Sequence, residues 1–314
     1  MRRTSLLIVT LLVAAACGGD DGSDTTTTLG STTTSSTTTT MGTTTTVEAT
    51  TTTQATTTTL RPGNWADVGL VVSPYGALGY WDGLAWVQIT EFTPLPIDGG
   101  EDYQVVRLGV EAVVTGGPEE RICEPLNNPG VELSDLAVLG GPFPDPVGLA
   151  ISAPWDLTPH FVQDETDDGA YSDFARPLLA ALGLAVPNPV IKQVVRFDMD
   201  GDGSNEVIAV AEEITGDAGI YGEEGNYSVV FMRTVVDGEV QTAVLAESVV
   251  ADLSEGEFPF ILSYAVAAIA DLSGDGKMEI VLNERYYEGA GWSVWEYVND
   301  DLGAVMQIVS GCGV

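Results

Sequence analysis

Basic residues are scarce in this sequence. Its 314 residues include 11 Lys and Arg against 46 Asp and Glu, which gives a formal net charge of −35. Cleavage of an N-terminal segment that carries Arg2 and Arg3 would change the net charge from −35 to −37. Such a surface repels the phosphate backbones of DNA and RNA, so we exclude a nucleic-acid partner. Cations are the natural partners of this charge, although acidity by itself also keeps a protein soluble.

Histidine is nearly absent, which argues against several kinds of catalysis. The single His160 stands in Leu-Thr-Pro-His-Phe, and no pattern around it suggests a catalytic triad or a zinc site. The sequence also lacks a Gly-rich phosphate loop and a Gly-x-Ser-x-Gly nucleophile turn. We therefore expect His160 to be structural, and we assign no catalytic residue.

Cysteine is limited to three positions, Cys17, Cys123 and Cys312. An even pair in an oxidising compartment predicts a disulfide between Cys123 and Cys312, and the alternative is two buried thiols. In the chain-entropy model, a bridge that closes so long a loop stabilises the fold by roughly 5 kcal/mol.

Long apolar runs are missing except at the N-terminus. Two arginines precede the apolar residues 6–16, and this pattern predicts a secretory signal peptide over residues 1–16. As a helix this run would be about 16 Å long, roughly half of a hydrocarbon core, so it is too short to span a membrane. Ala-Ala-Ala-Cys17 resembles the lipobox of bacterial lipoproteins, although Ala14 stands where Leu is commonest. The resemblance implies a lipid on Cys17 that anchors the exported chain to the bacterial cell membrane; the alternative is ordinary cleavage and a free thiol.

A threonine-rich tract follows the anchor. Between residues 25 and 59, 23 of 35 residues are Thr, mostly in groups of four. Such a segment cannot bury a core and is typical of an extended, O-glycosylated stalk. We therefore expect residues 17–61 to be a disordered stalk, and an unmodified flexible spacer is the alternative.

The rest of the chain is long enough for a packed core and reads as mainly β. Residues 62–189 contain short apolar runs separated by Gly, Pro and Asp, and one segment with helical spacing. We predict strands over residues 69–72, 85–89, 103–114 and 147–151. We predict a helix over residues 172–184, with Ser172 as its cap.

An internal repeat of about 73 residues occupies the region 190–314. The apolar residues before Asp198 align with those before Asp271, and the alternating run from Glu206 aligns with the run from Glu279. The pattern of each repeat predicts four strands in a meander. We expect two four-stranded, blade-like antiparallel repeats packed on the N-terminal β-rich region with its one helix.

An Asp-rich loop joins the first two strands of each repeat. Residues 198–206 read Asp-Met-Asp-Gly-Asp-Gly-Ser-Asn-Glu, and residues 271–279 read Asp-Leu-Ser-Gly-Asp-Gly-Lys-Met-Glu. Calcium takes about six to eight oxygen ligands at roughly 2.3–2.6 Å, which alternate residues of a tight loop supply together. The side chains of positions 1, 3, 5 and 9 and the carbonyl of position 7 are candidate ligands: Asp198, Asp200, Asp202, Ser204, Glu206 and Asp271, Ser273, Asp275, Lys277, Glu279.

An EF-hand begins in the same way but requires a bidentate Glu at position 12. Ala209 and Leu282 stand there instead, and β-type runs follow both loops where helices would be needed. The EF-hand is therefore excluded. Two structural calcium sites remain the expectation, and a pair of Asp-Gly hairpin turns without metal is the alternative.

The loops and their flanking strands resemble FG-GAP or VCBS-type repeats, the blades of integrin-α-like β-propellers, in which Asp-x-Asp/Asn-x-Asp-Gly-x-x-Asp joins two strands. The resemblance implies a calcium ion in each loop. Glu206 and Glu279 stand where Asp is usual, Ser273 replaces an acid, and the Phe-Gly and Gly-Ala-Pro signatures are missing. Two such loops favour two blades on a different β domain, with four divergent blades as the alternative.

We interpret the chain as a non-enzymatic, calcium-stabilised cell-surface lipoprotein that binds a protein or a glycan. Most aromatic residues are expected to fill cores, and Tyr286 and Tyr287 are the most loop-like contact candidates. One alternative is a secreted hydrolase acting on envelope or environmental polysaccharide through acids such as Asp156, Asp164 and Glu165. A second alternative is an envelope spacer protein without a soluble ligand.

Overall fold

The computed structural model describes residues 68–310 apart from 124–126, 141–145, 166–168, 187, 216–220, 237, 255, 257, 287–288 and 299–300, with backbone alone for 298 and 301–310. All of them belong to one compact unit, Leu60–Val314. The predicted signal peptide, Cys17, the stalk, Tyr287 and Cys312 lie outside the described residues. Within the described ranges, no helix has the length and apolar character needed to cross a membrane.

The N-terminal region forms a seven-stranded antiparallel sheet in the order β3-β2-β1-β7-β4-β5-β6. Its strands are β1 Gly69–Ser73, β2 Gly76–Trp81, β3 Trp86–Gln88, β4 Asp102–Val106, β5 Val113–Ile122, β6 Asn128–Leu133 and β7 Leu149–Ile151, with a short 3-10 helix at Leu136–Leu139. The sheet curls so that β6 comes back beside β2. Tyr80 and Tyr103 are buried in the core that this curl encloses.

The predicted single strand over 103–114 is wrong, because the chain reverses inside it. Arg107 and Val110 form an isolated bridge around a turn in which Gly109 has a φ of 69°, a conformation that suits glycine. The strands on either side, β4 and β5, pair with each other. In the turn, the Leu108 amide donates a hydrogen bond to the carbonyl of Ala267, so it docks on the C-terminal repeat.

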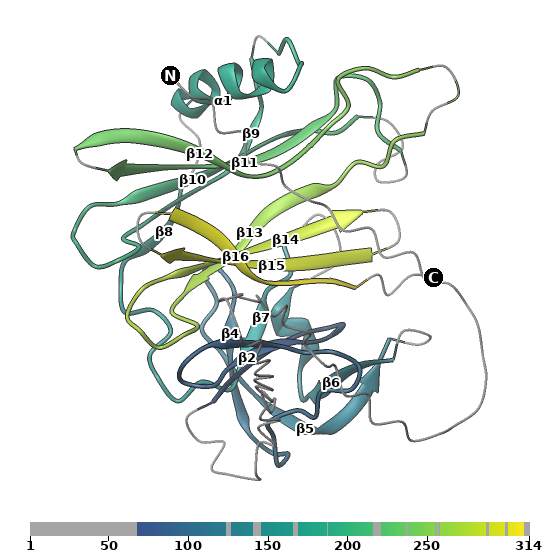
Figure 1. The fold of residues 1–314 in the computed structure, drawn as a ribbon, viewed down its shortest axis with the longest axis vertical. Coiled ribbons are helices and arrows are strands. Elements are labelled where there is room, and N and C mark those ends of the chain that lie inside the picture. Colours follow the sequence, from purple (N-terminus) through teal and green to yellow (C-terminus); the bar gives the residue numbers. More distant parts are fainter. Residues whose placement is uncertain are drawn as a thin grey trace, which may run out of the picture. The chain divides into compact units, whose positions relative to one another are not determined.

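The two repeats form separate antiparallel sheets, which confirms the predicted four-stranded meanders (Figure 1). The first has β9 Ile191–Phe197, β10 Glu206–Glu213, β11 Tyr227–Val236 and β12 Glu239–Val249, and the second has β13 Ser263–Ala270, β14 Glu279–Tyr286, β15 Gly289–Val298 and β16 Asp301–Ser310. An unexpected fifth strand, β8 Val162–Glu165, pairs with β9 and makes the first sheet five-stranded.

Buried side chains join the helix and the three sheets into successive layers (Figure 1). Leu179 of the helix packs with Phe231 on one face of the five-stranded sheet. The other face packs against the four-stranded sheet, where Phe197 and Ile280 share a core. Trp292 belongs to the core between the four-stranded and seven-stranded sheets. The second repeat therefore has both faces covered, which explains why its strand β14 is almost continuously buried.

The one α-helix among the described residues, α1 Ala170–Ala181, begins two residues before and ends three residues before the predicted bounds. Gly183 adopts a φ of 92°, and the amide of Leu184 donates to the carbonyl of Leu179, an arrangement that ends a helix. The Ser172 hydroxyl does not cap the helix as predicted and donates instead to the carbonyl of Pro189.

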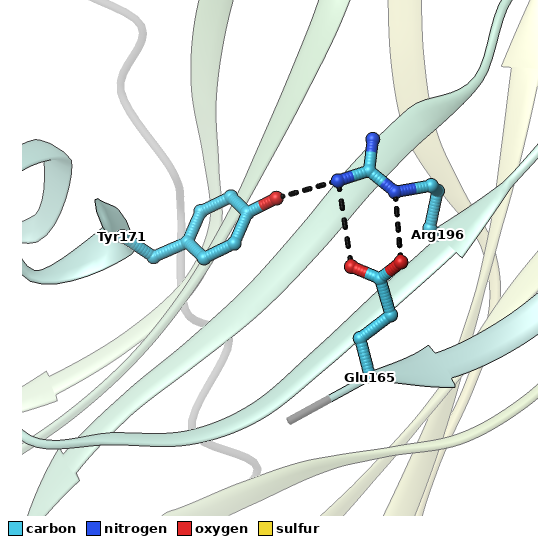
Figure 2. A network of polar contacts seen from close by, with 3 residues as sticks. All are labelled: Glu165, Tyr171 and Arg196. Carbon is cyan, nitrogen blue, oxygen red and sulfur yellow. Dashed lines mark hydrogen bonds and ion pairs between the residues drawn. The ribbon is translucent and has the colours of Figure 1, made fainter. Parts of the chain in front are cut away.

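A polar network fixes α1 and β8 to the first repeat (Figure 2). The guanidinium of Arg196, on β9, donates from Nε and Nη2 to the two carboxylate oxygens of Glu165 at 3.1 and 3.4 Å. Its Nη2 also donates to the Tyr171 hydroxyl at 2.9 Å. Two strands and the helix thus meet at one charged side chain, and hydrogen bonding to Glu165 raises the pKa of Arg196.

Candidate metal centre

The first Asp-rich loop connects β9 to β10 and is closed by its own carboxylates. The two oxygens of Asp198 accept hydrogen bonds from the amides of Gly201 and Gly203 at 2.9 and 3.1 Å. Asp202 accepts from the Ser204 amide at 2.6 Å, and Glu206 accepts from the Met199 amide at 2.9 Å. Every bond joins residues within seven positions, so the local sequence dictates this turn.

The second loop, between β13 and β14, repeats this pattern at equivalent positions. Asp271 accepts from the amides of Gly274 and Gly276, Asp275 accepts from the Lys277 amide, and Glu279 accepts from the Leu272 amide. The glycines of both loops have positive φ values: Gly201 78°, Gly203 86°, Gly274 75° and Gly276 85°. The two loops therefore share one backbone conformation as well as one sequence pattern.

Three carboxylates of the first loop gather where a cation could bind. Asp198, Asp200 and Asp202 each offer an oxygen, and these oxygens all lie within 4.8 Å of one another. Oxygens on opposite sides of a calcium ion lie about 5 Å apart, so this spacing fits the ion. Asp200 and Asp202 are exposed, which leaves the cluster open to ions from solution. The geometry suits hard cations as a class, of which calcium is one.

The second loop has fewer acids and is more deeply buried. Asp271, Ser273 and Glu279 have exposed fractions of 3%, 4% and 1%. Burial raises the pKa of Glu279 to about 8 and also raises that of Asp271. The Ser273 hydroxyl makes no hydrogen bond of ordinary geometry, although its proximity to Glu279 lowers the pKa of that carboxyl. A buried acid and an unsatisfied hydroxyl are groups that a bound cation would stabilise.

The two loops lie side by side. The Met278 amide donates a hydrogen bond to the carbonyl of Met199 at 2.8 Å, which joins the loops directly. His160 lies between them, with Nε2 2.6 Å from the carbonyl oxygen of Gly276 and its ring against Gly201. Because a carbonyl only accepts, this contact is a hydrogen bond in the tautomer that carries the N–H on Nε2.

Residues 155–161, which belong to the N-terminal region, contact both loops. The Trp155 indole donates from Nε1 to the carbonyl of Asp271 at 2.9 Å, and its ring covers Gly274. The amide of Asp271 donates to the carbonyl of Leu157, and the amide of Asp198 donates to that of Phe161. One segment thus holds the first residue of each loop in place.

Alanine at Gly201 is expected to destabilise the fold more than alanine at Gly203. Both substitutions place an L-residue at positive φ, at a cost of roughly 1–2 kcal/mol. A Cβ at Gly201 would also lie 2.6 Å from Cε1 of His160, whereas one at Gly203 would meet nothing within 4 Å. Displacing His160 and its hydrogen bond should add about 1 kcal/mol. Equal losses in the free energy of unfolding for Gly201→Ala and Gly203→Ala would contradict a clamping role for His160.

Glu279 is expected to make the calcium-free protein less stable as the pH rises. Its folded pKa lies above its ordinary value, so folding favours the protonated form: the stabilisation is complete below about pH 4.5 and is lost as the pH passes through about 8. Each pH unit in this range costs up to about 1.4 kcal/mol. Denaturant unfolding in EDTA between about pH 5 and 8 should show a flatter profile for Glu279→Gln than for the native chain, and superimposable profiles would refute the assignment.

Several residues of this centre could not be found from the sequence. Trp155 and His160 come from a segment without a motif, and His160 was notable only as the single histidine. Glu296, on β15, also lies near the second loop. Burial raises the pKa of Glu296, and the nearby carboxylate of Asp275 raises it further. Its chain neighbour Trp295 pairs with Ile280, next to Glu279, so only strand register brings Glu296 to the loop.

The other predicted sites remain predictions. Tyr286 is half-buried at the end of β14, and its neighbour Tyr287 lies outside the described residues, so their role in ligand contact is untested. Cys123 directly follows β5 with a φ of 67°, and the position of Cys312 is not described. Among the aromatics, Tyr80 and Trp292 are buried in cores as expected.

Comparisons of the chain with family models, curated proteins and solved structures find no match in any of the three.

Proposed function

We propose that this chain is a non-enzymatic, calcium-stabilised lipoprotein that is anchored through Cys17 and presents a binding domain outside the cell. The observation that carries the proposal is the matching hydrogen-bond pattern of the two Asp-rich loops, with the clustered carboxylates of Asp198, Asp200 and Asp202 in the first. Calcium would act on structure, because each loop joins two strands and both are tied to the N-terminal region.

Calcium binding is supported by the chemistry of the donor groups. The first loop concentrates negative charge at an exposed turn, and the coulombic effect of Asp200 adds to burial in raising the pKa of Glu206. In the second loop, Lys277 and Ser273 reduce the negative charge, and burial makes the remaining acids costly to ionise. A divalent ion would offset the repulsion between the acids of the first loop and the cost of ionising the buried acids of the second. Removal of the ion should therefore weaken the contact between the repeats.

The hydrolase alternative gains no support from the acids proposed for it. Glu165 is held by both of its oxygens in an ion pair with Arg196. Asp156 accepts from the Thr158 amide in a local turn. Asp164 lies on the short edge strand β8, where its side chain is exposed to solvent although partial burial raises the pKa of its carboxyl. His160, the one histidine, uses Nε2 for the Gly276 carbonyl.

Ligand screening would test the binding function. The purified mature chain, in buffer with calcium, should form a stable complex with a component of a glycan array or an envelope-protein panel. It should not hydrolyse chromogenic glycosides. Turnover without sustained binding would favour the hydrolase. Negative results in every screen would favour the envelope spacer protein. Calorimetric titration with calcium, repeated on Asp202→Ala, would test the metal sites independently of any ligand.

A further inference from the structure

Three exposed aromatic rings form a continuous surface, which we call the aromatic patch: Tyr221, Phe258 and Phe260. Their exposed fractions are 47%, 67% and 67%. The ring centroid of Tyr221 lies 5.2 Å from that of Phe258 and 5.9 Å from that of Phe260. Among the described residues, no other group of exposed rings makes contacts of this kind across three members.

The backbone beneath the patch is fixed by contacts between two loops. Tyr221 belongs to the connection between β10 and β11, and both phenylalanines belong to the connection between β12 and β13. The Gly222 amide donates to the carbonyl of Pro259 at 2.7 Å, and the Gly225 amide donates to that of Val250 at 2.8 Å. The rings are therefore presented on a preformed surface, which lowers the entropy cost of binding.

The patch lies away from the metal centre. Strand β10 begins at Glu206, beside the first Asp-rich loop, and ends at Glu213, before the connection that carries Tyr221. Strand β13 likewise begins after Phe260 and ends at Ala270, beside the second loop. Eight residues of strand span about 25 Å, so a ligand on the patch would not touch the calcium ligands.

The surroundings of the patch are acidic. Glu223, Glu224 and Asp252 are exposed in the same two connections. From residue 198 to residue 276 the sequence has one basic residue, Arg233, whose guanidinium carbon lies 3.5 Å from the centre of the Phe174 ring. The faces of aromatic rings carry negative potential and attract cations, so the rings and the carboxylates favour the same charge in a ligand.

We propose that the aromatic patch binds a segment of a protein partner in which Arg or Lys alternates with apolar residues. Apolar side chains would cover the rings, and the cationic groups would meet ring faces and carboxylates. Two of the three rings are phenylalanine, which offers no hydrogen bond to a sugar hydroxyl, and this favours a peptide over a glycan. The inference rests on the proposed binding function and names the surface and the partner class for it.

Fluorescence anisotropy with a labelled peptide of alternating Arg and Leu would test this proposal on the full mature chain in calcium. The native chain should bind it and should not bind the same peptide with Glu in place of Arg. Phe258→Ser combined with Phe260→Ser should weaken binding about 10-fold or more. Phe92→Ser removes an isolated exposed ring, 84% exposed, and should change binding less than about 2-fold. Added salt should weaken binding because part of the attraction is between exposed charges.

Equal affinity of the folded double variant and the native chain would overturn the proposal, since binding would then reflect only overall acidity. Failure of the native chain to bind the peptide would also overturn it. Loss of a glycan-array signal in the double variant, with peptide binding unchanged, would assign the patch to a glycan; the partner class would then be wrong while the proposed binding function stands. Melting curves for each variant establish that it is folded.

Discussion

Removing calcium is expected to lower the melting temperature of this protein by about 10 °C or more. Extracellular modules typically bind calcium with dissociation constants of about 10⁻⁴–10⁻³ M. At about 10 mM calcium, a site at the tighter end of this range stabilises the folded state by about 2.7 kcal/mol, and two sites by about 5 kcal/mol. A domain of this size shifts its melting temperature by about 2–4 °C per kcal/mol. The measurement is thermal unfolding in calcium and in EDTA.

Single substitutions would assign the effect to each loop. Asp202→Ala and Asp275→Ala each remove the carboxylate at position 5, so each should reduce the difference between calcium and EDTA by about half if the sites contribute equally. Asp98→Ala is a matched control, because Asp98 is exposed and lies outside both loops. No shift on chelation, together with no metal in elemental analysis, would leave the loops as metal-free turns.

Trp292→Ala is expected to cost about 3–5 kcal/mol of unfolding free energy, the range for removing a large buried aromatic side chain. Trp292 is fully buried between the four-stranded and seven-stranded sheets, where its ring meets Tyr75 edge-on at 5.6 Å. Its indole Nε1 also donates to the carbonyl of Val147 at 2.8 Å. The alanine variant leaves both a cavity and an unsatisfied carbonyl, so denaturant unfolding in calcium should move to a much lower midpoint.

Two other substitutions separate packing from hydrogen bonding at this position. Trp292→Phe keeps a ring but removes the indole donor, and it should cost less than the alanine variant. Trp81→Ala removes a ring that is only partly buried beside Trp86, and it should cost about 1–2 kcal/mol. A loss for Trp292→Ala no larger than that for Trp81→Ala would contradict its place in the core between the sheets.

The repeats and their loops could be predicted because their structure is local. Alternation of apolar residues indicates strands, and Asp and Gly at fixed offsets produce the same hydrogen bonds at Asp198 and Asp271. The meanders follow because consecutive strands pair with their neighbours. Deviations in the first half have local causes as well: Gly109 divides the strand predicted over 103–114, and Gly183 ends α1 before the predicted boundary.

The aromatic residues show where local patterns fail. Trp292, Tyr80 and the exposed Phe258 and Phe260 all stand in apolar or turn-rich segments, and composition does not separate buried rings from exposed ones. Phe174 of α1 is likewise 37% exposed, and the buried residues of that helix are Ala175 and Leu179. Which side of a helix or loop is covered depends on the element that packs against it.

The sequence by itself determined the acidic charge, the repeat and the conformation of the two Asp-rich loops, because hydrogen bonds within seven residues fix each turn. The anchor at Cys17, the stalk and the calcium ions are predictions of the same local kind. Only the tertiary structure decided that the loops lie side by side, with His160 between them and 116 residues from its partner Gly276. It also brought Tyr221 against Phe258 and Phe260. Such contacts depend on how whole sheets pack, which no local pattern encodes.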